Sequence, residues 1–524
     1  MNKAKRYEFD VIIVGSGIAG LSAAATAAEQ GLRVAVITKG IRLIDANTWY
    51  AQGGIVGSSD SDSPDLLERD IVNAGGGINS REAVQLLVKN GPKLVDEFLI
   101  EKLQVPFSKS VDGRPDLTKE AAHSVRRIYH AKDTTGKAIL EAMIPNIEAS
   151  EGISLFPNHT AIDLITNIHN STDPERKYHQ TRVIGLYSLD GSSSEVAAFF
   201  APSVILATGG VGNLYLHTSN PVGANGDGVA MAYRIGAEVL NTEYIQFHPT
   251  VLFHRDRKRF LISETLRGEG ARLLNKQGEE FTERYIPNAG DMGPRDEVSR
   301  AIYREMEREE SDYVSLDATR IRDIDPADRF PSIYQTCLSL GIDIRKEPIP
   351  VVPAAHYFCG GVKVDLWGKT SIAGLFSAGE TACTGLHGAN RLASVSLLEG
   401  LVWGVRCGEA VARDRFDLPK SLIGSVPDWI DPRIKEEFDP VLVKQDFRTI
   451  QSTMWNYAGI IRSRKRLMRA QADLDYLSHR IEQFYRGAKL SRRIIELRNS
   501  VLTSIIIVRA ALANPVSKGC HYIE

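Results

Sequence analysis

The first strongly patterned stretch of the chain is residues 9–28, where an apolar run at 11–14 precedes three glycines and an alanine-rich segment. The apolar run predicts a buried parallel strand, and the alanine-rich segment predicts a helix. Gly15, Gly17 and Gly20 stand between them with the G-x-G-x-x-G spacing of a dinucleotide-binding turn. The first glycine permits the tight turn, the second lets the backbone approach a pyrophosphate, and the third lets helix and strand pack closely. We therefore predict that the start of this helix binds the phosphates of a dinucleotide.

Later stretches predict further elements of the same domain. Residues 33–38 form a second apolar run, which predicts the next strand, and residues 80–105 have helical periodicity. The last β-type run within residues 153–206 leads into a glycine-rich turn, and so does the run at 374–377. We therefore predict that the first of these runs returns to the first sheet and adds a backbone contact near the dinucleotide, and that the second belongs to the same domain.

The last hundred residues have a different pattern, with long charged segments of helical periodicity at 445–469, 471–485 and 491–511. These segments predict a helical bundle. Residues 238–350 lack the glycine-rich character of the segments on either side, so we predict an inserted domain there.

Together these patterns predict an α/β protein with a discontinuous Rossmann-like dinucleotide-binding domain. The expected domains are the dinucleotide-binding domain at 1–237 and 351–418, an inserted α+β capping domain at 238–350, and a C-terminal helical domain at 419–524. A capping domain beside the cofactor would bind the substrate and exclude water as a lid.

The end of the second predicted strand departs from the usual dinucleotide pattern. An acidic residue near this position commonly binds ribose hydroxyls, but Thr38 and Lys39 stand here instead. This argues against NAD and leaves Thr38 or Lys39 to contact the ribose or the phosphates. Asp227, before another predicted helix, is either a helix cap or a ligand of cofactor hydroxyls. Residues 47–54 combine two aromatic side chains, which can pack on a flat ring, with paired glycines, although alone they are equally typical of a surface loop.

The composition is that of an ordinary globular protein of roughly two to four domains. The chain has 524 residues, of which 43% are hydrophobic and 24% charged, and its formal net charge is −2. The chain has no excess of basic residues that would indicate binding to nucleic acid or to an anionic membrane. The stretch at 11–28 is only weakly hydrophobic and no comparably long apolar segment follows, so we predict a soluble, cytoplasmic protein.

The cysteines give no indication of a metal site. The five of them are scattered and include no C-x-x-C pair, which argues against an iron–sulfur or zinc site in this chain. Their odd number and spacing fit a reducing compartment.

Residues 117–136 hold an unusual concentration of polar groups, namely Glu120, His123, Arg126, Arg127, His130 and Asp133. Without further context, such a run is more typical of the solvated face of a helix than of a site. Single histidines beside proline or in apolar runs, such as His248 and His356, are likewise more often packing residues.

Taken together, the short motifs resemble the succinate dehydrogenase and fumarate reductase flavoprotein family over essentially the whole chain. They are GSGIAG, YAQGGI, LTKEAAHSVRRIYHAKDTTG, ILATGG, GDG, QFHPT, RGEG, PRDEVSRAI, PAAHYFCGG and GETACTGLHGANRLAS. Within that family they are most similar to the L-aspartate oxidase branch, which begins quinolinate and NAD synthesis in bacteria.

The resemblance implies FAD as the cofactor, bound without a covalent link. In the membrane-bound succinate-oxidising relatives a histidine attaches FAD, and Asn47 stands at that position here. The residues implied to bind FAD are Gly15, Ser16, Gly17, Ile18, Ala19, Gly20, Thr38, Lys39, Asn47, Thr48, Trp49, Tyr50, Ala51, Gln52, Gly53, Gly54, Asp227, Glu380, Ser396 and Leu397.

The resemblance also implies L-aspartate as the substrate. Arg391 offers a planar fork for one carboxylate, and His248 and His356 can donate hydrogen bonds to the other. Glu120 is implied to orient the amino group, which a dicarboxylate reductase has no need to hold.

Arg295 resembles the arginine that shuttles protons in the fumarate-reducing direction. A guanidinium can act in this way only beside a carboxylate, either Asp296 or Glu264, and the alternative is an ordinary ion pair with Asp296.

Two positions depart from the family. Val395 replaces an asparagine, which implies one polar contact fewer near the flavin. Lys518 replaces an arginine, so if this residue bridges domains the C-terminal helices dock less firmly.

The implied reaction is FAD-dependent oxidation of L-aspartate to iminoaspartate, with dioxygen, which yields hydrogen peroxide, or fumarate as the electron acceptor. A quinolinate synthase is the implied partner that consumes iminoaspartate. Two other functions stay open: a soluble fumarate reductase or flavoprotein subunit of a succinate dehydrogenase, and a flavin-bearing binding or sensor module without turnover.

Overall fold

A parallel five-stranded sheet in the order β18-β11-β2-β3-β7 lies at the centre of the computed structural model, which describes residues 5–110, 112–255, 260–430 and 439–524. The strands are β2 (Val11–Val14), β3 (Val34–Ile37), β7 (Ile153–Phe156), β11 (Ser203–Leu206) and β18 (Leu375–Ser377). Because β11 pairs with both β2 and β18, the predicted return of the chain to the first sheet is confirmed. Every residue of β2, β3 and β11 is buried, as expected for parallel strands covered on both faces.

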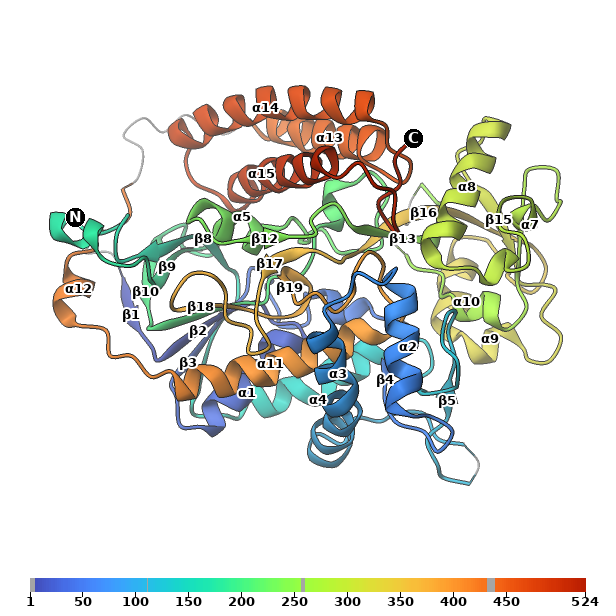
Figure 1. Cartoon of the computed structure of the whole chain (residues 1–524), viewed down its shortest axis with the longest axis horizontal. Helices are drawn as coiled ribbons and strands as arrows, with labels where there is room; N and C mark the ends of the chain where they lie inside the picture. The colour runs from blue at the N-terminus through green and yellow to red at the C-terminus, as the bar shows by residue number, and fades with distance from the viewer. Residues whose placement is uncertain (1–4, 111, 256–259, 431–438) are drawn as a thin grey trace.

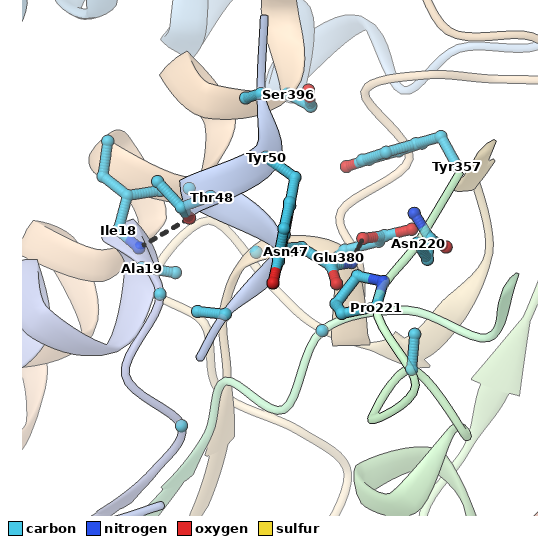
Figure 2. Close-up of a pocket in the computed structure, with 18 of the residues that line it drawn as sticks. Ile18, Ala19, Asn47, Thr48, Tyr50, Asn220, Pro221, Tyr357, Glu380 and Ser396 are labelled. Carbon is cyan, nitrogen blue, oxygen red and sulfur yellow. Dashed lines mark hydrogen bonds between the residues drawn. The ribbon is translucent and has the colours of Figure 1, made fainter. Parts of the chain in front are cut away.

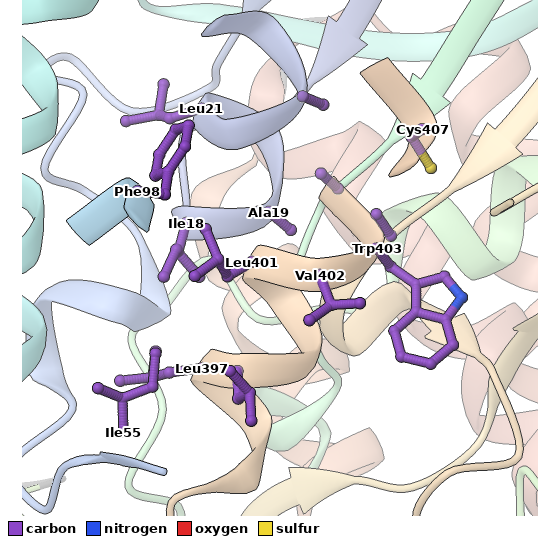
Figure 3. Close-up of a cluster of buried hydrophobic side chains, with 14 of the residues drawn as sticks. Ile18, Ala19, Leu21, Ile55, Phe98, Leu397, Leu401, Val402, Trp403 and Cys407 are labelled. Atoms are coloured by element: carbon purple, nitrogen blue, oxygen red, sulfur yellow. The ribbon is translucent and has the colours of Figure 1, made fainter. Parts of the chain in front are cut away.

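Helices α1 (Ile18–Glu29) and α11 (Val395–Arg413) pack side by side on one face of this sheet (Figure 3). Small residues allow their close approach, because a Cβ atom on Gly404 would lie 2.5 Å from the carbonyl oxygen of Ala19. Trp403, which is fully buried, fills the core behind them. Helices α3 (Arg81–Leu94) and α4 (Thr135–Glu148) complete the layer and contact α11 and α1, respectively. This packing brings the N-terminal ends of α1 and α11 to one cavity.

Three smaller sheets surround the parallel sheet. A four-stranded sheet in the order β1-β10-β9-β8 contributes to the core on the second face, and two three-stranded sheets have the orders β12-β17-β19 and β4-β6-β5. Their strands are β1 (Arg6–Glu8), β4 (Ile55–Val56), β5 (Leu117–Thr118), β6 (Ile128–Tyr129), β8 (His159–Thr166), β9 (Val183–Asp190), β10 (Val196–Phe200), β12 (Val239–Leu240), β17 (Gly361–Lys363) and β19 (Ala382–Cys383).

A separate antiparallel sheet and its own core form the part of the molecule around α8 (Figure 1). The sheet has the order β13-β16-β15-β14, with β13 (Ile245–Leu252), β14 (Arg272–Leu274), β15 (Val314–Asp317) and β16 (Ile349–Phe358). Helix α8 (Arg295–Glu309) packs on β13. Strand β16 runs through the boundary expected at residue 351, and the division into domains stays a prediction.

Residues 117–136 do not form the solvated helical face that their charge pattern favours. They contain β5 and β6, which pair with each other, and most of their polar side chains turn inward. Arg127 has no exposed surface and lies 3.0 Å from carboxylate oxygens of both Asp62 and Asp70. The helical reading is wrong because partners distant in the sequence neutralise these charges inside the protein.

Three long helices, α13 (Pro440–Tyr457), α14 (Arg464–Gly487) and α15 (Arg492–Ala513), form the C-terminal bundle shown in Figure 1. The expected break at residue 470 is wrong, because the chain turns between 458 and 463. Ser463 caps α14 by accepting a hydrogen bond from the Arg466 N–H at 3.3 Å. Helix α15 packs against α5 (Asp227–Arg234), which begins at a predicted cofactor residue.

The remaining helical segments are shorter. The α-helices among them are α2 (Pro64–Ala74), α6 (Thr265–Gly268), α7 (Thr282–Tyr285), α9 (Pro326–Arg329), α10 (Pro331–Ser339) and α12 (Lys420–Gly424). The others are a π-helical turn (Val95–Lys102) and the 3₁₀ turns Asn47–Tyr50, Pro174–Tyr178, Gly212–Leu214, Gly290–Met292 and Gly379–Thr381. Within the described part of the chain, no helix combines the length and the apolar character that crossing a bilayer requires.

Candidate active site

One cavity of about 240 Å³ brings the predicted cofactor residues and the predicted catalytic residues together. Figure 2 shows that Ile18, Thr48, Tyr50 and Glu380, from segments far apart in the sequence, surround the same space. All the residues proposed from the sequence line this cavity except Gly20 and Trp49.

The glycine turn between β2 and α1 has a backbone that only glycine fits. Gly15 has a φ of +122°, and a Cβ atom there would lie 2.0 Å from the carbonyl oxygen of Ala207. A Cβ atom on Gly20 would lie 2.1 Å from the carbonyl oxygen of Gly15. Gly20 therefore lets the helix pack closely against the turn, as expected for the third glycine, and its place among the cofactor residues stays a prediction.

The N-terminus of α1 offers hydrogen-bond donors to the cavity. Its first turn has no side-chain cap at Gly17 and no acidic residue, and the Ile18 N–H donates to Thr48 Oγ1 at 3.1 Å. The buried Gln52 Oε1, which also lines the cavity, has no hydrogen-bond partner among the described residues. Helix-end donors suit a pyrophosphate, and the unpaired acceptor suits a cofactor N–H or hydroxyl, so these residues fit FAD.

Asn47 is held by a second buried group of the cavity. Its Nδ2 donates to Glu380 Oε2 at 2.9 Å, and Glu380 Oε1 accepts from the Phe358 N–H at 3.0 Å. Burial raises the pKa of Glu380 to about 7. An amide cannot form the covalent flavin link that a histidine forms, so this arrangement fits a non-covalent cofactor.

Lys39 lies at the end of β3 between two carboxylates. Its Nζ is 2.5 Å from Asp227 Oδ2 and 3.0 Å from Glu496 Oε1 of helix α15. Asp227 also accepts a hydrogen bond from Asn499 Nδ2 at 2.8 Å and makes no side-chain cap for α5. Of the two readings of Asp227, the structure therefore favours a cavity-lining group over a helix cap.

Trp49 does not line the cavity, and its assignment as a cofactor residue stays a prediction. Residues 47–50 form a 3₁₀ turn, in which side chains three positions apart share a side. Asn47 and Tyr50 consequently line the cavity, whereas Trp49 packs against the core and lies 5.5 Å below Lys137 Nζ.

Two arginines meet at the opposite end of the cavity. Gln246 Oε1 accepts from Arg391 Nε at 3.2 Å and from Arg295 Nη1 at 3.4 Å. Arg391 also donates to Ser396 Oγ at 2.7 Å and lies over the Tyr357 ring at 4.6 Å. Neutral acceptors thus hold Arg391 in place, which leaves its positive charge available to an anionic ligand, whereas Arg295 also has a carboxylate partner.

The carboxylate partner of Arg295 is Glu264, whose Oε2 lies 2.5 Å from Arg295 Nε. The alternative pair with Asp296 is absent, because Asp296 instead accepts from Arg300 at 2.9 Å. Burial raises the pKa of Glu264, but the combined attraction of Arg295 and the buried Arg267 holds that pKa below its ordinary value.

Glu120 reaches the same end of the cavity from the turn between β5 and β6. Ser394 Oγ donates to its Oε2 at 2.5 Å, and a Cβ atom on Gly53 would lie 2.5 Å from its Oε1. Burial, with repulsion from Glu264, raises the pKa of Glu120 despite the attraction of Arg295.

The two histidines face each other with ring centroids 5.1 Å apart. The Thr250 N–H donates to His248 Nδ1 at 3.2 Å, so the proton of this ring lies on Nε2, and Ser219 Oγ lies 2.7 Å from His356 Nδ1. Burial, reinforced by the nearby arginines, holds the pKa of both rings well below the ordinary value. Both rings are therefore neutral at neutral pH, and His248 has its Nε2–H available to donate.

Sequence reasoning missed Gln246, Ser219 and Tyr357 as residues of the site. Gln246 stands two positions before His248 in β13, so strand periodicity could have assigned both to one face. Val395, by contrast, lies in the hydrophobic core beneath the cavity and offers no polar contact.

Comparisons with known proteins agree with this geometry. Residues 10–397 match the family described as the FAD binding domain. The chain is 42% identical to an L-aspartate oxidase of Acinetobacter baylyi, over 99% of this chain and 94% of the relative. It is also 42% identical to an L-aspartate oxidase of Pseudomonas aeruginosa, over 99% of this chain and 96% of the relative.

Among solved structures, the fold is similar to that of FrdA from an E. coli quinol fumarate reductase, with a TM-score of 0.87. The sequence identity is 27%, and the match covers 99% of this chain and 92% of the other.

Proposed function

Since this chain belongs to the L-aspartate oxidase family of FAD-dependent flavoproteins, we propose that its cavity oxidises L-aspartate to iminoaspartate. The observation that carries this proposal is the meeting of one unpaired carboxylate, Glu120, with two arginines and two neutral histidines at a single cavity. A dicarboxylate substrate needs the cations, and only a substrate with an ammonium group needs the added anion.

Each group then has a distinct task. Arg391 binds one substrate carboxylate through its planar fork, and the Nε2–H of His248 and the ring of His356 donate to the other. Glu120 accepts hydrogen bonds from the amino group and fixes the α-carbon in one orientation.

The charge of Arg295 is supported by the ion pair with Glu264. Burial lowers the pKa of Arg295, but Glu264 and Glu120 together raise it above its ordinary value. We therefore assign Arg295 to holding the substrate carboxylate in the aspartate-oxidising direction, with Glu264 as its fixed counter-ion, and proton transfer by Arg295 to the fumarate-reducing direction.

The cofactor site comprises the α1 N-terminus, the 47–54 segment, Lys39 with Asp227, and the start of α11. These elements would hold FAD without a covalent bond. The chemistry that FAD supplies when bound is acceptance of the hydride from the α-carbon, with dioxygen or fumarate as the final acceptor.

Anaerobic mixing of the FAD-loaded protein with L-aspartate tests the proposal. We expect the visible absorption of oxidised flavin to bleach in proportion to the L-aspartate added, and admission of dioxygen to restore it with formation of hydrogen peroxide. Bleaching by succinate but not by L-aspartate would instead favour the fumarate reductase or succinate dehydrogenase reading. Bleaching by neither would favour a binding module without turnover.

The proposed reaction does not by itself identify a partner enzyme or a cell compartment. Iminoaspartate is a reactive imine, so an enzyme that consumes it quickly, as a quinolinate synthase would, fits the product. That partner and a cytoplasmic location stay predictions, which co-purification and fractionation of the source cells would check.

A further inference from the structure

In the C-terminal segment, residues 517–524, Cys520 and His521 are buried, whereas Ser517 and Glu524 at its ends are exposed. In Figure 1 the segment runs from the end of the bundle toward α8 and β13. Arg462, itself fully buried, donates to His521 Nδ1 and to the Glu243 carbonyl oxygen, each at 2.7 Å. Arg462 thus anchors the segment to Glu243, which lies three positions before Gln246 in the sequence.

The segment also touches the loop that carries Arg391. The Cys520 N–H donates to the Ala389 carbonyl oxygen at 2.9 Å, and Cys520 Sγ donates to Asn390 Oδ1 at 3.2 Å. Gly519 has a φ of +53°, and a Cβ atom there would lie 2.5 Å from the same Ala389 oxygen. Residues 519–520 therefore contact both residues that precede Arg391. Their backbone contacts Ala389, and the Cys520 side chain contacts Asn390.

A short chain of hydrogen bonds connects this contact to both arginines. Asn390 Oδ1, which accepts from Cys520, also accepts from Gln246 Nε2 at 2.7 Å. Gln246 Oε1 in turn accepts from Arg391 and Arg295, as described above. Asn390 Nδ2 donates at 3.0 Å to Asp296, which follows Arg295 in the sequence.

The segment holds the helix that begins with Arg295 as well. Arg300, in α8, donates through Nη1 to the Gly519 carbonyl oxygen at 3.0 Å, and Arg304 donates to the Tyr522 hydroxyl at 3.0 Å. On the other side, Lys518 Nζ donates to the Gly76 carbonyl oxygen at 3.0 Å. The segment thus spans elements that sequence reasoning assigned to three different domains.

We propose that residues 519–520 position Arg391 and Arg295 for dicarboxylate binding, by fixing Asn390 and through it Gln246. Two guanidinium groups around one acceptor repel each other, so their spacing needs an external restraint. The inference rests on the proposed function, in which these arginines hold the substrate carboxylates. Neither Gly519 nor Cys520 lines the cavity, so both act through other residues.

Gly519→Ala tests the proposal, with Gly278→Ala as the matched control. Gly278 has a φ of +81°, and a Cβ atom there would have no neighbour within 4 Å, so its substitution gives the same backbone strain without pressure on a neighbour. For Gly519→Ala we expect the KM for L-aspartate, and the Kd for succinate from flavin absorption shifts, to rise about tenfold. The Kd for FAD should stay within about twofold, and Gly278→Ala should match the wild type in all three.

Equal rises in the two glycine variants, or an unchanged succinate Kd in Gly519→Ala, would overturn the positioning role. The succinate titration needs no turnover, so it decides this inference even if L-aspartate fails to bleach the wild-type flavin, which would overturn only the proposed reaction.

A second pair of variants covers the case in which Gly519→Ala does not fold. Cys520→Ala removes the donor to Asn390 without adding atoms, whereas Cys520→Ser keeps a hydroxyl donor at the same place. We expect the succinate Kd to rise about threefold or more in Cys520→Ala and to return to near the wild-type value in Cys520→Ser. Wild-type values in both variants would count against the proposal.

Discussion

Replacement of Glu120 by glutamine separates the binding of an amino group from the binding of two carboxylates. Glutamine has nearly the same size and keeps an oxygen that can accept from Ser394 Oγ, which lies 2.5 Å from the native carboxylate. The variant loses only the negative charge. Because Glu120 is 4% exposed, little solvent is available to take over its role.

The expected magnitude follows from the charge on the substrate. A hydrogen bond to a charged group contributes about 1.5–3 kcal/mol, against about 0.5–1.5 kcal/mol for a neutral pair. The charged bond exceeds the neutral one by about 1–1.5 kcal/mol, so at about 1.4 kcal/mol for each factor of ten, loss of the charge should lower kcat/KM for L-aspartate oxidation about 5- to 12-fold. Fumarate has no ammonium group, so its reduction should change by less than about threefold.

The assay measures both reactions on one preparation, at matched FAD content: L-aspartate with dioxygen, and fumarate with a reduced dye. Glu305→Gln is the control, since Glu305 is a fully buried carboxylate of α8 that binds Tyr285 at 2.6 Å and lies outside the cavity. It should alter stability without changing the ratio of the two activities. Equal losses of both activities in Glu120→Gln would refute the assignment of Glu120 to the amino group.

Three further variants probe other parts of the reasoning. Gly15→Ala should abolish FAD binding in a fluorescence titration, since its Cβ would lie 2.0 Å from the Ala207 carbonyl oxygen at a φ of +122°. Lys39→Met should raise the Kd for FAD at least about tenfold and lower the Tm, because it leaves the buried Asp227 without its cation and Glu496 with Arg492 alone. Burial, with repulsion from Arg462, lowers the pKa of His521 to about 4, so the unfolded chain takes up the proton first below pH 6.5. The free energy of unfolding should therefore fall by about 2 kcal/mol more between pH 6.5 and pH 5 in the wild type than in His521→Asn, measured by urea denaturation.

The parts of this molecule that were predictable from sequence are those whose cause is local. The strand, the glycine turn and the helix at 11–29 follow from residues adjacent in the chain, and the structure has all three. The parallel strands β11 and β18 were recognisable because an apolar run that leads into a glycine turn has the same local form wherever it occurs.

The features that sequence reasoning missed depend on distant partners or on the direction of a turn. From the sequence, Arg127 is expected to be a surface charge, but in the structure Asp62 and Asp70 pair with it in the interior. Trp49 and Tyr50 are adjacent aromatic residues that the sequence pattern does not distinguish. The geometry of the 3₁₀ turn directs Trp49 toward the core and Tyr50 toward the cavity. The contact of Cys520 with Asn390 joins residues 130 positions apart, which no local pattern encodes.

The two acidic residues around Arg295 show how one fold gives identical groups different roles. Both Glu120 and Glu264 are buried, and burial alone would raise the pKa of each. Glu264 bonds directly to Arg295 and also lies 3.8 Å from Arg267, so its pKa falls below the ordinary value and its charge is committed to the protein. Among the described residues, Glu120 has only the Ser394 hydroxyl as a direct side-chain partner, and its pKa is raised, so its charge is compensated less within the protein. A cationic group entering the cavity therefore gains more by binding Glu120 than by competing for Glu264. We infer that this difference, rather than the presence of carboxylates as such, would make an amino acid a better fit to the cavity than a simple dicarboxylate.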